Sequence, residues 1–296
     1  MNEMICSVCP RGCSAVRTDE TGSGVCAMGV LPKLARAALH LWEEPCISGE
    51  RGSGTVFFSG CPLKCVFCQN REISTGGFGK TVSVSRLREI FHELIAQGAH
   101  NINLVNPTHF TGSILEAVRG GLSVPLVWNS GGYERPETLR RLDGVVNIYL
   151  PDMKYALSAP AARYSAAADY PETAKAAIRE MFRQTGPYVM DEDGMLQSGV
   201  IIRHLILPGN LENTQKVIDW VASEFSPGDV LFSLMSQYTP CLEQPKKYPE
   251  LTRRLTRGEY DAAVAMLEAS GIEDGFFQEL SSAKEEYIPE FNLRGV

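Results

Sequence analysis

The sequence has no long apolar run, no low-complexity tract and no internal repeat. Its longest apolar stretches, such as residues 145–150, are far too short to span a bilayer. The first residues, Met-Asn-Glu-Met-Ile-Cys, contain neither the basic region nor the apolar core of a signal peptide. We therefore expect a cytoplasmic protein with no membrane segment.

The chain also lacks an excess of positive charge. It has 28 Lys and Arg against 35 Asp and Glu, which gives a formal net charge of −7 over 296 residues. This balance disfavours a surface built for nucleic-acid phosphates or anionic lipid. The hydrophobic share of 44% and the charged share of 21% are ordinary for a globular protein, and they exclude disorder for the bulk of the chain.

Cysteine is the residue that the chain has in unusual number. Eight of its nine cysteines lie within the first 68 residues. A secreted disulfide scaffold is short and usually has an even number of cysteines, and this chain has neither property. In a reducing cytosol, clustered thiols usually bind a metal or react.

Short apolar segments alternate with amphipathic segments from Thr55 onward. The predicted strands are Thr55–Ser59, Asn101–Val105, Pro125–Asn129, Val146–Leu150, Gly199–Leu207 and Val230–Met235. The predicted helices are Ser85–Gln97, Ser113–Arg119, Pro136–Leu142, Pro171–Gln184 and Leu211–Ser223, and a short helix is also predicted over Leu31–Leu41. Repeated strand–helix units imply parallel strands joined by right-handed crossovers.

The length of the alternating region limits the fold. An eight-unit barrel needs about 250 residues, whereas residues 55–240 number 186. We therefore predict an α/β fold, a partial (β/α)6 TIM-like barrel over residues 55–240. A small Cys-rich N-terminal segment with a linker, residues 1–54, would precede it. A helical C-terminal extension, residues 241–296, would follow it.

Three cysteines directly follow the first predicted strand. Cys61, Cys65 and Cys68 have the spacing C-x3-C-x2-C. A structural zinc ion needs four ligands, whereas an iron–sulfur cluster can use three thiolates and leave one iron open. The loop follows the carboxyl end of a strand, where sites form in parallel α/β folds. The alternative is a zinc loop completed by a distant Cys or His.

This segment resembles the signature of the radical S-adenosylmethionine (SAM) enzymes, which is C-x3-C-x2-C with an aromatic residue before the last cysteine. Phe67 fills the aromatic position. The resemblance implies a [4Fe–4S] cluster on Cys61, Cys65 and Cys68, whose open iron chelates the amino and carboxylate groups of SAM. An electron from the cluster would cleave SAM to methionine and a 5′-deoxyadenosyl radical, which abstracts a hydrogen atom.

Three further strand ends resemble the pyruvate formate-lyase activating enzyme branch of that superfamily. They are Asn129-Ser-Gly-Gly-Tyr, Asp152-Met-Lys154, and the strand with Arg203 that ends in Pro-Gly. The resemblance implies that Asn129, Asp152 and Lys154 meet the ribose, carboxylate or sulfonium region of SAM. It likewise implies that Arg203 meets the SAM carboxylate. The alternatives are that Asp152 and Lys154 pair with each other, that Arg203 is a structural ion-pair partner, and that Asn129 only begins a turn.

Two departures from that branch indicate a divergent subgroup. The Gly-Gly-Glu-Pro segment after the second strand is replaced by Val-Asn106-Pro-Thr108-His109, and the His after the sixth strand is replaced by Gln237. Asn106, Thr108, His109 and Gln237 are candidates for cofactor contacts because they too follow strands, and the alternative is that they pack around the site. The substrate would be a glycyl radical enzyme or a small molecule, and flavodoxin or ferredoxin would supply the electron.

The remaining cysteines form a second group near the N-terminus. Cys6, Cys9, Cys13 and Cys26 could complete a structural zinc site or a second [4Fe–4S] cluster, and the alternative is four free thiols. The short segment has too little apolar sequence to fold without such a metal. Cys46 and Cys241 stand alone and are predicted to be buried small hydrophobic residues.

A competing hypothesis is a non-catalytic cysteine-rich metal-binding protein that recognises a partner or RNA. The acidic balance and the charged strand ends disfavour it. His204 is predicted to point away from the site, because neighbours on a strand alternate faces and His204 follows Arg203.

Overall fold

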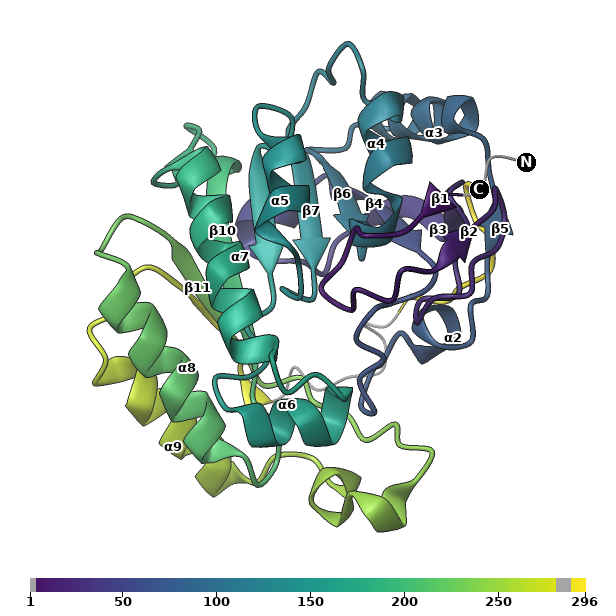
Figure 1. Ribbon diagram of the computed structural model, residues 1–296. Helices are drawn as coiled ribbons and strands as arrows, with labels where there is room; N and C mark the ends of the chain where they lie inside the picture. The colour runs from purple at the N-terminus through teal and green to yellow at the C-terminus, as the bar shows by residue number, and fades with distance from the viewer. Residues whose placement is uncertain (1–3, 281–288) are drawn as a thin grey trace.

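The computed structural model describes residues 4–280 and 289–296. Its core is a curved sheet with helices packed on its outer face (Figure 1). Six parallel strands lie side by side in chain order: β4 (Ser53–Phe58), β6 (Ile102–Val105), β7 (Leu126–Ser130), β8 (Ile148–Pro151), β10 (Leu196–Leu205) and β11 (Leu231–Met235). The predicted α/β partial barrel is confirmed.

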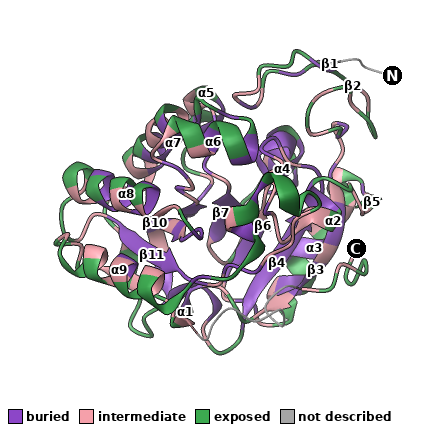
Figure 2. Cartoon of the chain, turned by 90° about the horizontal axis from the view of Figure 1, so that it is seen from below, coloured by how far each residue is buried: buried purple, intermediate pink, exposed green. Residues whose placement is uncertain are grey.

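The helices between these strands cover the outside of the barrel. They are α3 (Val84–Ala96), α4 (Thr111–Ala117), α5 (Pro136–Leu139), α6 (Ser158–Ser165), α7 (Tyr170–Thr185) and α8 (Leu211–Glu224). In α3 the N-cap Ser83 accepts a hydrogen bond from the Arg86 amide. Its apolar face buries Leu87, Phe91 and Leu94 against the sheet, and each buried side chain contributes about 1.5–3 kcal/mol. Figure 2 shows this pattern, with exposed outer helix faces around buried strands.

The prediction of a helix over Leu31–Leu41 is wrong. Residues Lys33–His40 form strand β3, which pairs antiparallel with β4. Alanine and leucine favour a helix locally, but the ladder with β4 satisfies the backbone and buries Leu34, Ala35 and Ala37. Tertiary pairing therefore outweighs the local preference.

Additional short elements extend the sheet beyond the six strands. β5 (Lys80–Thr81) pairs with β3, β9 (Val189–Met190) pairs with β10, and β12 (Gly275–Phe277) lies parallel to β11. β1 (Met4–Ile5) and β2 (Val16–Arg17) form a separate ribbon in the N-terminal segment. The sheet thus receives strands from all three predicted segments of the chain.

The C-terminal residues cover part of the outer side of β3. The Leu293 amide donates to the Ala35 carbonyl at 3.0 Å, and the Ala37 amide donates to the Arg294 carbonyl at 2.8 Å. Residues 293–294 thus lie along the edge of the sheet that β3 forms.

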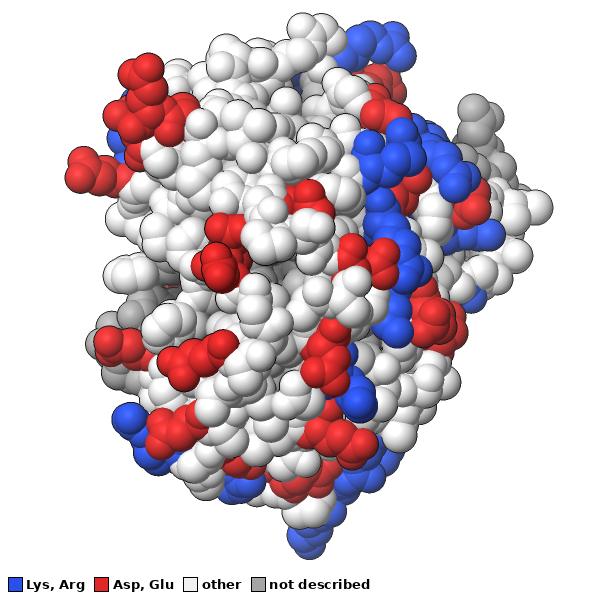
Figure 3. Space-filling view, turned by 90° about the vertical axis from the view of Figure 1, so that its left-hand side faces the viewer, with Lys and Arg blue, Asp and Glu red and all other residues white. Residues whose placement is uncertain are grey.

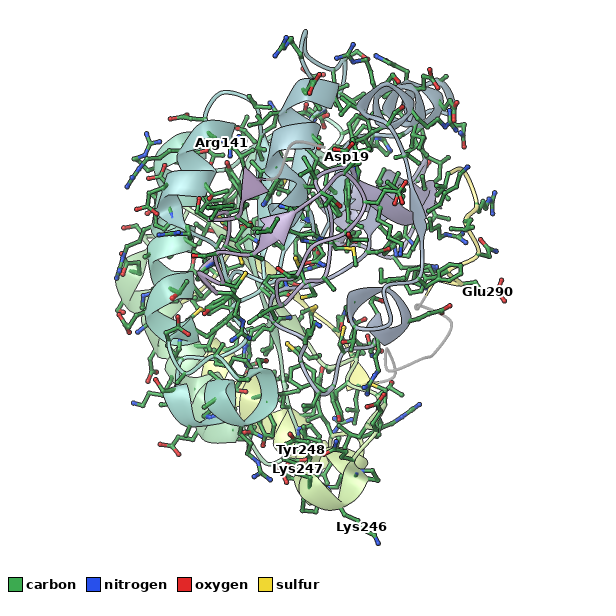
Figure 4. All side chains as sticks on the ribbon, turned by 45° about the vertical axis from the view of Figure 1, so that its right-hand side comes forward. Asp19, Arg141, Lys246, Lys247, Tyr248 and Glu290 are labelled. Carbon is green, nitrogen blue, oxygen red and sulfur yellow. The ribbon has the colours of Figure 1, made fainter. Side chains whose placement is uncertain are left out.

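The tail after β11 returns to the barrel through aromatic contacts. It contains the single turns η3 (Pro245–Lys247) and η4 (Pro249–Thr252) and the helix α9 (Arg257–Glu268). Tyr248 packs edge-on against Tyr164 of α6, with ring centres 5.9 Å apart, and Tyr164 in turn meets Phe67 at 6.4 Å. Figure 4 shows Tyr248 beside Lys246 and Lys247 at the lower end of the molecule. These contacts connect the tail to the three-cysteine loop.

The remaining short elements are α1 (Pro45–Ser48), α2 (Arg71–Ser74), η1 (Thr108–Phe110) and η2 (Arg140–Leu142). In the part of the chain that the structure describes, no helix is long and apolar enough to cross a membrane. On one side of the molecule, basic side chains form a narrow band bordered by acidic ones rather than a broad positive surface (Figure 3).

Candidate active site

A cavity of about 260 Å³ lies at the carboxyl ends of the parallel strands. Sites of parallel α/β barrels form at this edge, because the loops there converge on one point. The lining includes ten of the residues predicted from the sequence: Cys61, Cys65, Phe67, Cys68, Asn106, Asn129, Asp152, Lys154, Arg203 and Gln237. The strand ends therefore bring the three thiols and the charged side chains together.

The three-cysteine loop is held by hydrogen bonds to its sulfur atoms. The Ser165 hydroxyl lies 2.9 Å from Cys65 Sγ, the Ser74 hydroxyl 3.2 Å from Cys68 Sγ, and the Leu63 amide 3.4 Å from Cys61 Sγ. Burial raises the pKa of all three thiols, that of Cys61 to about 12. The donors are placed to stabilise negative sulfur, which is the form that binds metal.

Two cations and two carboxylates share the same cavity. Lys154 Nζ lies 2.5 Å from Asp152 Oδ2, and the Arg203 guanidinium lies 3.0 Å from Asp152 Oδ1. Arg203 also binds Glu43 Oε2 at 3.0 Å and the Asn129 side-chain oxygen at 2.7 Å. The side chains of the four charged residues are 10–19% exposed.

The charges of this set balance. Burial alone would raise the pKa of Asp152, but the neighbouring Lys154 and Arg203 outweigh it and hold that pKa below the usual value. Burial works against the charged forms of Lys154 and Arg203, yet their acidic neighbours raise the pKa of both. A cavity lined by two fixed cations and by carboxylates can accept a ligand that carries an ammonium and a carboxylate, because each group meets an opposite charge.

Sequence reasoning missed Glu43. It follows β3 in a stretch that was predicted to be only a linker, and it reaches the cavity from that side. Besides Arg203, its Oε1 accepts from the side chains of Asn103 at 3.1 Å and Asn129 at 3.3 Å. Only the position of β3, which the sequence did not reveal, would have placed Glu43 there.

The residues at the two departures from the activating enzymes lie in different places. Asn106 has a left-handed backbone (φ 60°), and its side chain donates to the Gly60 carbonyl beside Cys61. Gln237 lines the cavity, and its backbone carbonyl accepts a hydrogen bond from the Gln69 side chain at 3.2 Å.

Thr108 and His109 are absent from the described lining of this cavity. The Thr108 hydroxyl donates to the buried carboxylate of Glu134 at 2.7 Å. His109 Nε2 lies 2.7 Å from the Ser59 carbonyl. His204 also points away from the site, with Nδ1 2.7 Å from the Met153 carbonyl and Nε2 3.0 Å from the Thr214 hydroxyl.

One buried tyrosine ties these strand ends together. The Tyr170 hydroxyl lies 2.6 Å from the Asp152 carbonyl and 2.8 Å from the Gly131 carbonyl, and it accepts from the Lys154 amide at 2.9 Å. Gly132 beside it has a φ of 73°, and a Cβ there would clash with the Asp152 carbonyl.

We expect Gly132→Ala to weaken ligand binding in the cavity and to destabilise the protein. Gly144→Ala is the matched control, since Gly144 has the same φ of 73° but open space around the added methyl group. The left-handed backbone alone costs about 1–2 kcal/mol with alanine, so both variants lose that amount in chemical denaturation. A larger loss in Gly132→Ala measures the contact with Asp152, and equal losses would contradict this role of Gly132.

The N-terminal segment docks on the three-cysteine loop. Arg11, between Cys9 and Cys13, donates to the carbonyls of Pro62 at 2.7 Å and Ser165 at 2.7 Å. Its guanidinium also lies over the ring of Tyr133, 5.4 Å from the ring centre. The loop is thus held from the side of the N-terminal segment as well as from within the barrel.

Comparison with known proteins identifies relatives of this chain. Residues 47–142 match the family described as a 4Fe-4S single cluster domain. The uncharacterized protein MJ0674 of Methanocaldococcus jannaschii is 31% identical over 278 residues, which cover 90% of this chain and 75% of the relative. The chain belongs to the MJ0674 family.

Solved structures show the same fold as this MJ0674-family chain. A radical SAM methyltransferase from Sphaerobacter thermophilus has a TM-score of 0.51 and 13% identity, over 76% of this chain and 66% of the other. Streptococcus suis SuiB bound to S-adenosylmethionine has a TM-score of 0.52 and 11% identity, over 77% and 50%. The chain spans about half to two thirds of the length of these proteins, and at such identities the likeness shows the partial-barrel fold.

Proposed function

We propose that this member of the MJ0674 family is a radical SAM enzyme. The observation that carries the proposal is the cavity itself, in which three cysteines spaced C-x3-C-x2-C face a charge-balanced set of strand-end residues. The match to a 4Fe-4S domain and the fold shared with radical SAM proteins support it.

The side chains present fit both a cluster and SAM. Cys61, Cys65 and Cys68 would hold a [4Fe–4S] cluster and leave one iron without a protein ligand. When bound, the cluster supplies the electron that cleaves SAM reductively to methionine and a 5′-deoxyadenosyl radical. Arg203 would bind the SAM carboxylate, and Asp152 would bind a cationic group of SAM.

The chain positions these groups before any ligand arrives. Arg203 is fixed by Asp152, Glu43 and Asn129, and Lys154 is fixed by Asp152. Ligand binding exchanges part of these contacts for contacts to SAM, so little side-chain ordering remains to be done on binding. Phe67 packs edge-on against Tyr155, Tyr164 and Tyr238 and holds the loop against the barrel.

The substrate and the electron donor extend the same proposal. The hydrogen atom would come from a glycyl radical enzyme or from a small molecule, and flavodoxin or ferredoxin would supply the electron. A second cavity shares Glu43, Arg203, Met235 and Gln237 with the first and continues past Phe276 and Glu279. We propose this second cavity as the route by which the substrate reaches the site.

The test is SAM cleavage by anaerobically reconstituted protein. With dithionite as reductant, we expect 5′-deoxyadenosine and methionine to form in equal amounts. Binding of iron and sulfide without any SAM cleavage, and without SAM binding, would favour the non-catalytic metal-binding alternative.

Asp152→Ala and Lys154→Ala should weaken SAM binding while leaving the visible spectrum of the cluster unchanged. Each removes a hydrogen bond to a charged group, worth about 1.5–3 kcal/mol, or roughly ten- to a hundredfold in affinity. Lys175→Ala is a matched control, since Lys175 forms an ion pair with Glu172 on the outside of α7. Equilibrium dialysis with labelled SAM measures the change, and unchanged affinity in both site variants would show that the pair is structural.

A further inference from the structure

The four cysteines of the N-terminal segment line one small cavity. Cys6, Cys9, Cys13 and Cys26 surround it together with Arg17 and His109. Cys6 and Cys9 are buried, Cys26 is half-buried and Cys13 is exposed. Turns in a stretch of about twenty residues thus bring four thiols to one place, apart from the cavity of Cys61, Cys65 and Cys68.

Arg17 is a buried cation inside this group. Arg17 is 2% exposed. Its guanidinium donates hydrogen bonds to the carbonyls of Met28 and Gly29, and it lies 3.9 Å from Cys6 Sγ. Within residues 4–280 and 289–296, no carboxylate forms an ion pair with it. A buried charge is costly unless an opposite charge compensates it. The sulfur atoms are the groups placed to provide that negative charge.

His109 contributes a buried ring nitrogen without a hydrogen-bond partner to the same cavity. It is 2% exposed, and its Nδ1 has no hydrogen-bond partner, whereas its Nε2 lies 2.7 Å from the Ser59 carbonyl. Buried polar atoms are almost always paired in native proteins. An unpaired ring nitrogen beside four thiols indicates that this cavity holds something more than the side chains themselves.

We propose that Cys6, Cys9, Cys13 and Cys26 hold a second, thiolate-bound metal centre, with Arg17 as its buried counter-charge. Each thiol gives up its proton on binding. Four thiolates around Zn²⁺ leave a net charge of about −2, and so do four thiolates around an oxidised [4Fe–4S] cluster. Arg17 neutralises part of that charge in either case.

In the described part of the chain, no group of three or more His, Cys, Asp or Glu side chains is already gathered around the position of a single ion. The four thiolates would therefore move closer together on binding a zinc ion. The metal count distinguishes zinc from a [4Fe–4S] cluster.

The test uses the full chain with the first site removed. In the variant C61A/C65A/C68A, we expect either about four irons with four sulfides or about one zinc per chain after anaerobic reconstitution. Adding C13S should abolish that content, whereas adding Cys46→Ala should not, since Cys46 is buried elsewhere beneath the barrel. Iron and zinc both near zero in the folded triple variant would overturn the proposal.

The role of Arg17 is tested in the same background. Arg17→Lys keeps the charge and should retain most of the metal. Arg17→Gln should lose the metal to a chelator at least ten times faster than the parent does. Circular dichroism of the metal-loaded variants shows that the barrel is folded in each case. Equal metal retention in Arg17→Gln and in the parent protein would refute the role of Arg17 as the counter-charge of the metal centre. If the centre is iron–sulfur, a lower reduction potential in Arg17→Gln is the expected signature.

Discussion

Replacing Cys61, Cys65 or Cys68 by alanine is expected to abolish the formation of 5′-deoxyadenosine from SAM. Each variant leaves only two of the three thiolates that hold the cluster, and the hydrogen-bond donor at that sulfur loses its partner. Product analysis by chromatography after anaerobic reconstitution and reduction measures the effect, which should reach the background of the assay.

Cys46→Ala is the matched control for this experiment. Cys46 is also buried, but it packs with Ile47 and Ile148 in a separate apolar cluster beneath the barrel. We expect nearly full activity from it. Full activity in any one of the three site variants would overturn the radical SAM assignment.

Arg203→Met is expected to be the most destabilising of the single substitutions at the strand ends. Removing the guanidinium takes the ion-pair partner from Glu43 and leaves Asp152 with Lys154 alone, in a cavity where the Asp152 and Glu43 side chains are 16% and 10% exposed. Removing one member of a buried ion pair typically costs about 3–5 kcal/mol. Chemical denaturation of the protein without ligands measures this loss, and SAM binding should weaken in parallel.

Arg86→Met provides the comparison on the surface. Arg86 on α3 also binds two carboxylates, those of Glu89 and Glu93, but these side chains are 62% and 49% exposed. Such a pair contributes about 1 kcal/mol or less, and methionine suits a helix as well as arginine does. Equal losses in the two variants would mean that the Arg203 network contributes no more than a surface pair does.

The sequence was sufficient to predict the part of the site that depends on local spacing. The three-cysteine loop and the residues Asn129, Asp152 and Arg203 lie at or just after the carboxyl ends of strands whose apolar pattern is clear, and parallel strands place these ends at one edge. The placement of these side chains in one cavity agrees with that reasoning.

The missed features depend on contacts between distant segments. β3 has an alanine-rich sequence that favours a helix by itself, and only its pairing with β4 makes it a strand. Glu43 could not be placed without it. The hydrogen bonds from Arg11 to the Pro62 and Ser165 carbonyls join residues more than fifty positions apart, and no local sequence pattern predicts them.

β3 would otherwise be an edge strand with free backbone groups along its outer side. β5 covers Lys33 and Leu34, and the backbone of residues 293–294 covers Ala35 and Ala37. Open edges of this kind allow sheets of separate molecules to join. Residues 293–294 thus leave fewer free backbone groups at this edge for pairing with the sheet of a second molecule.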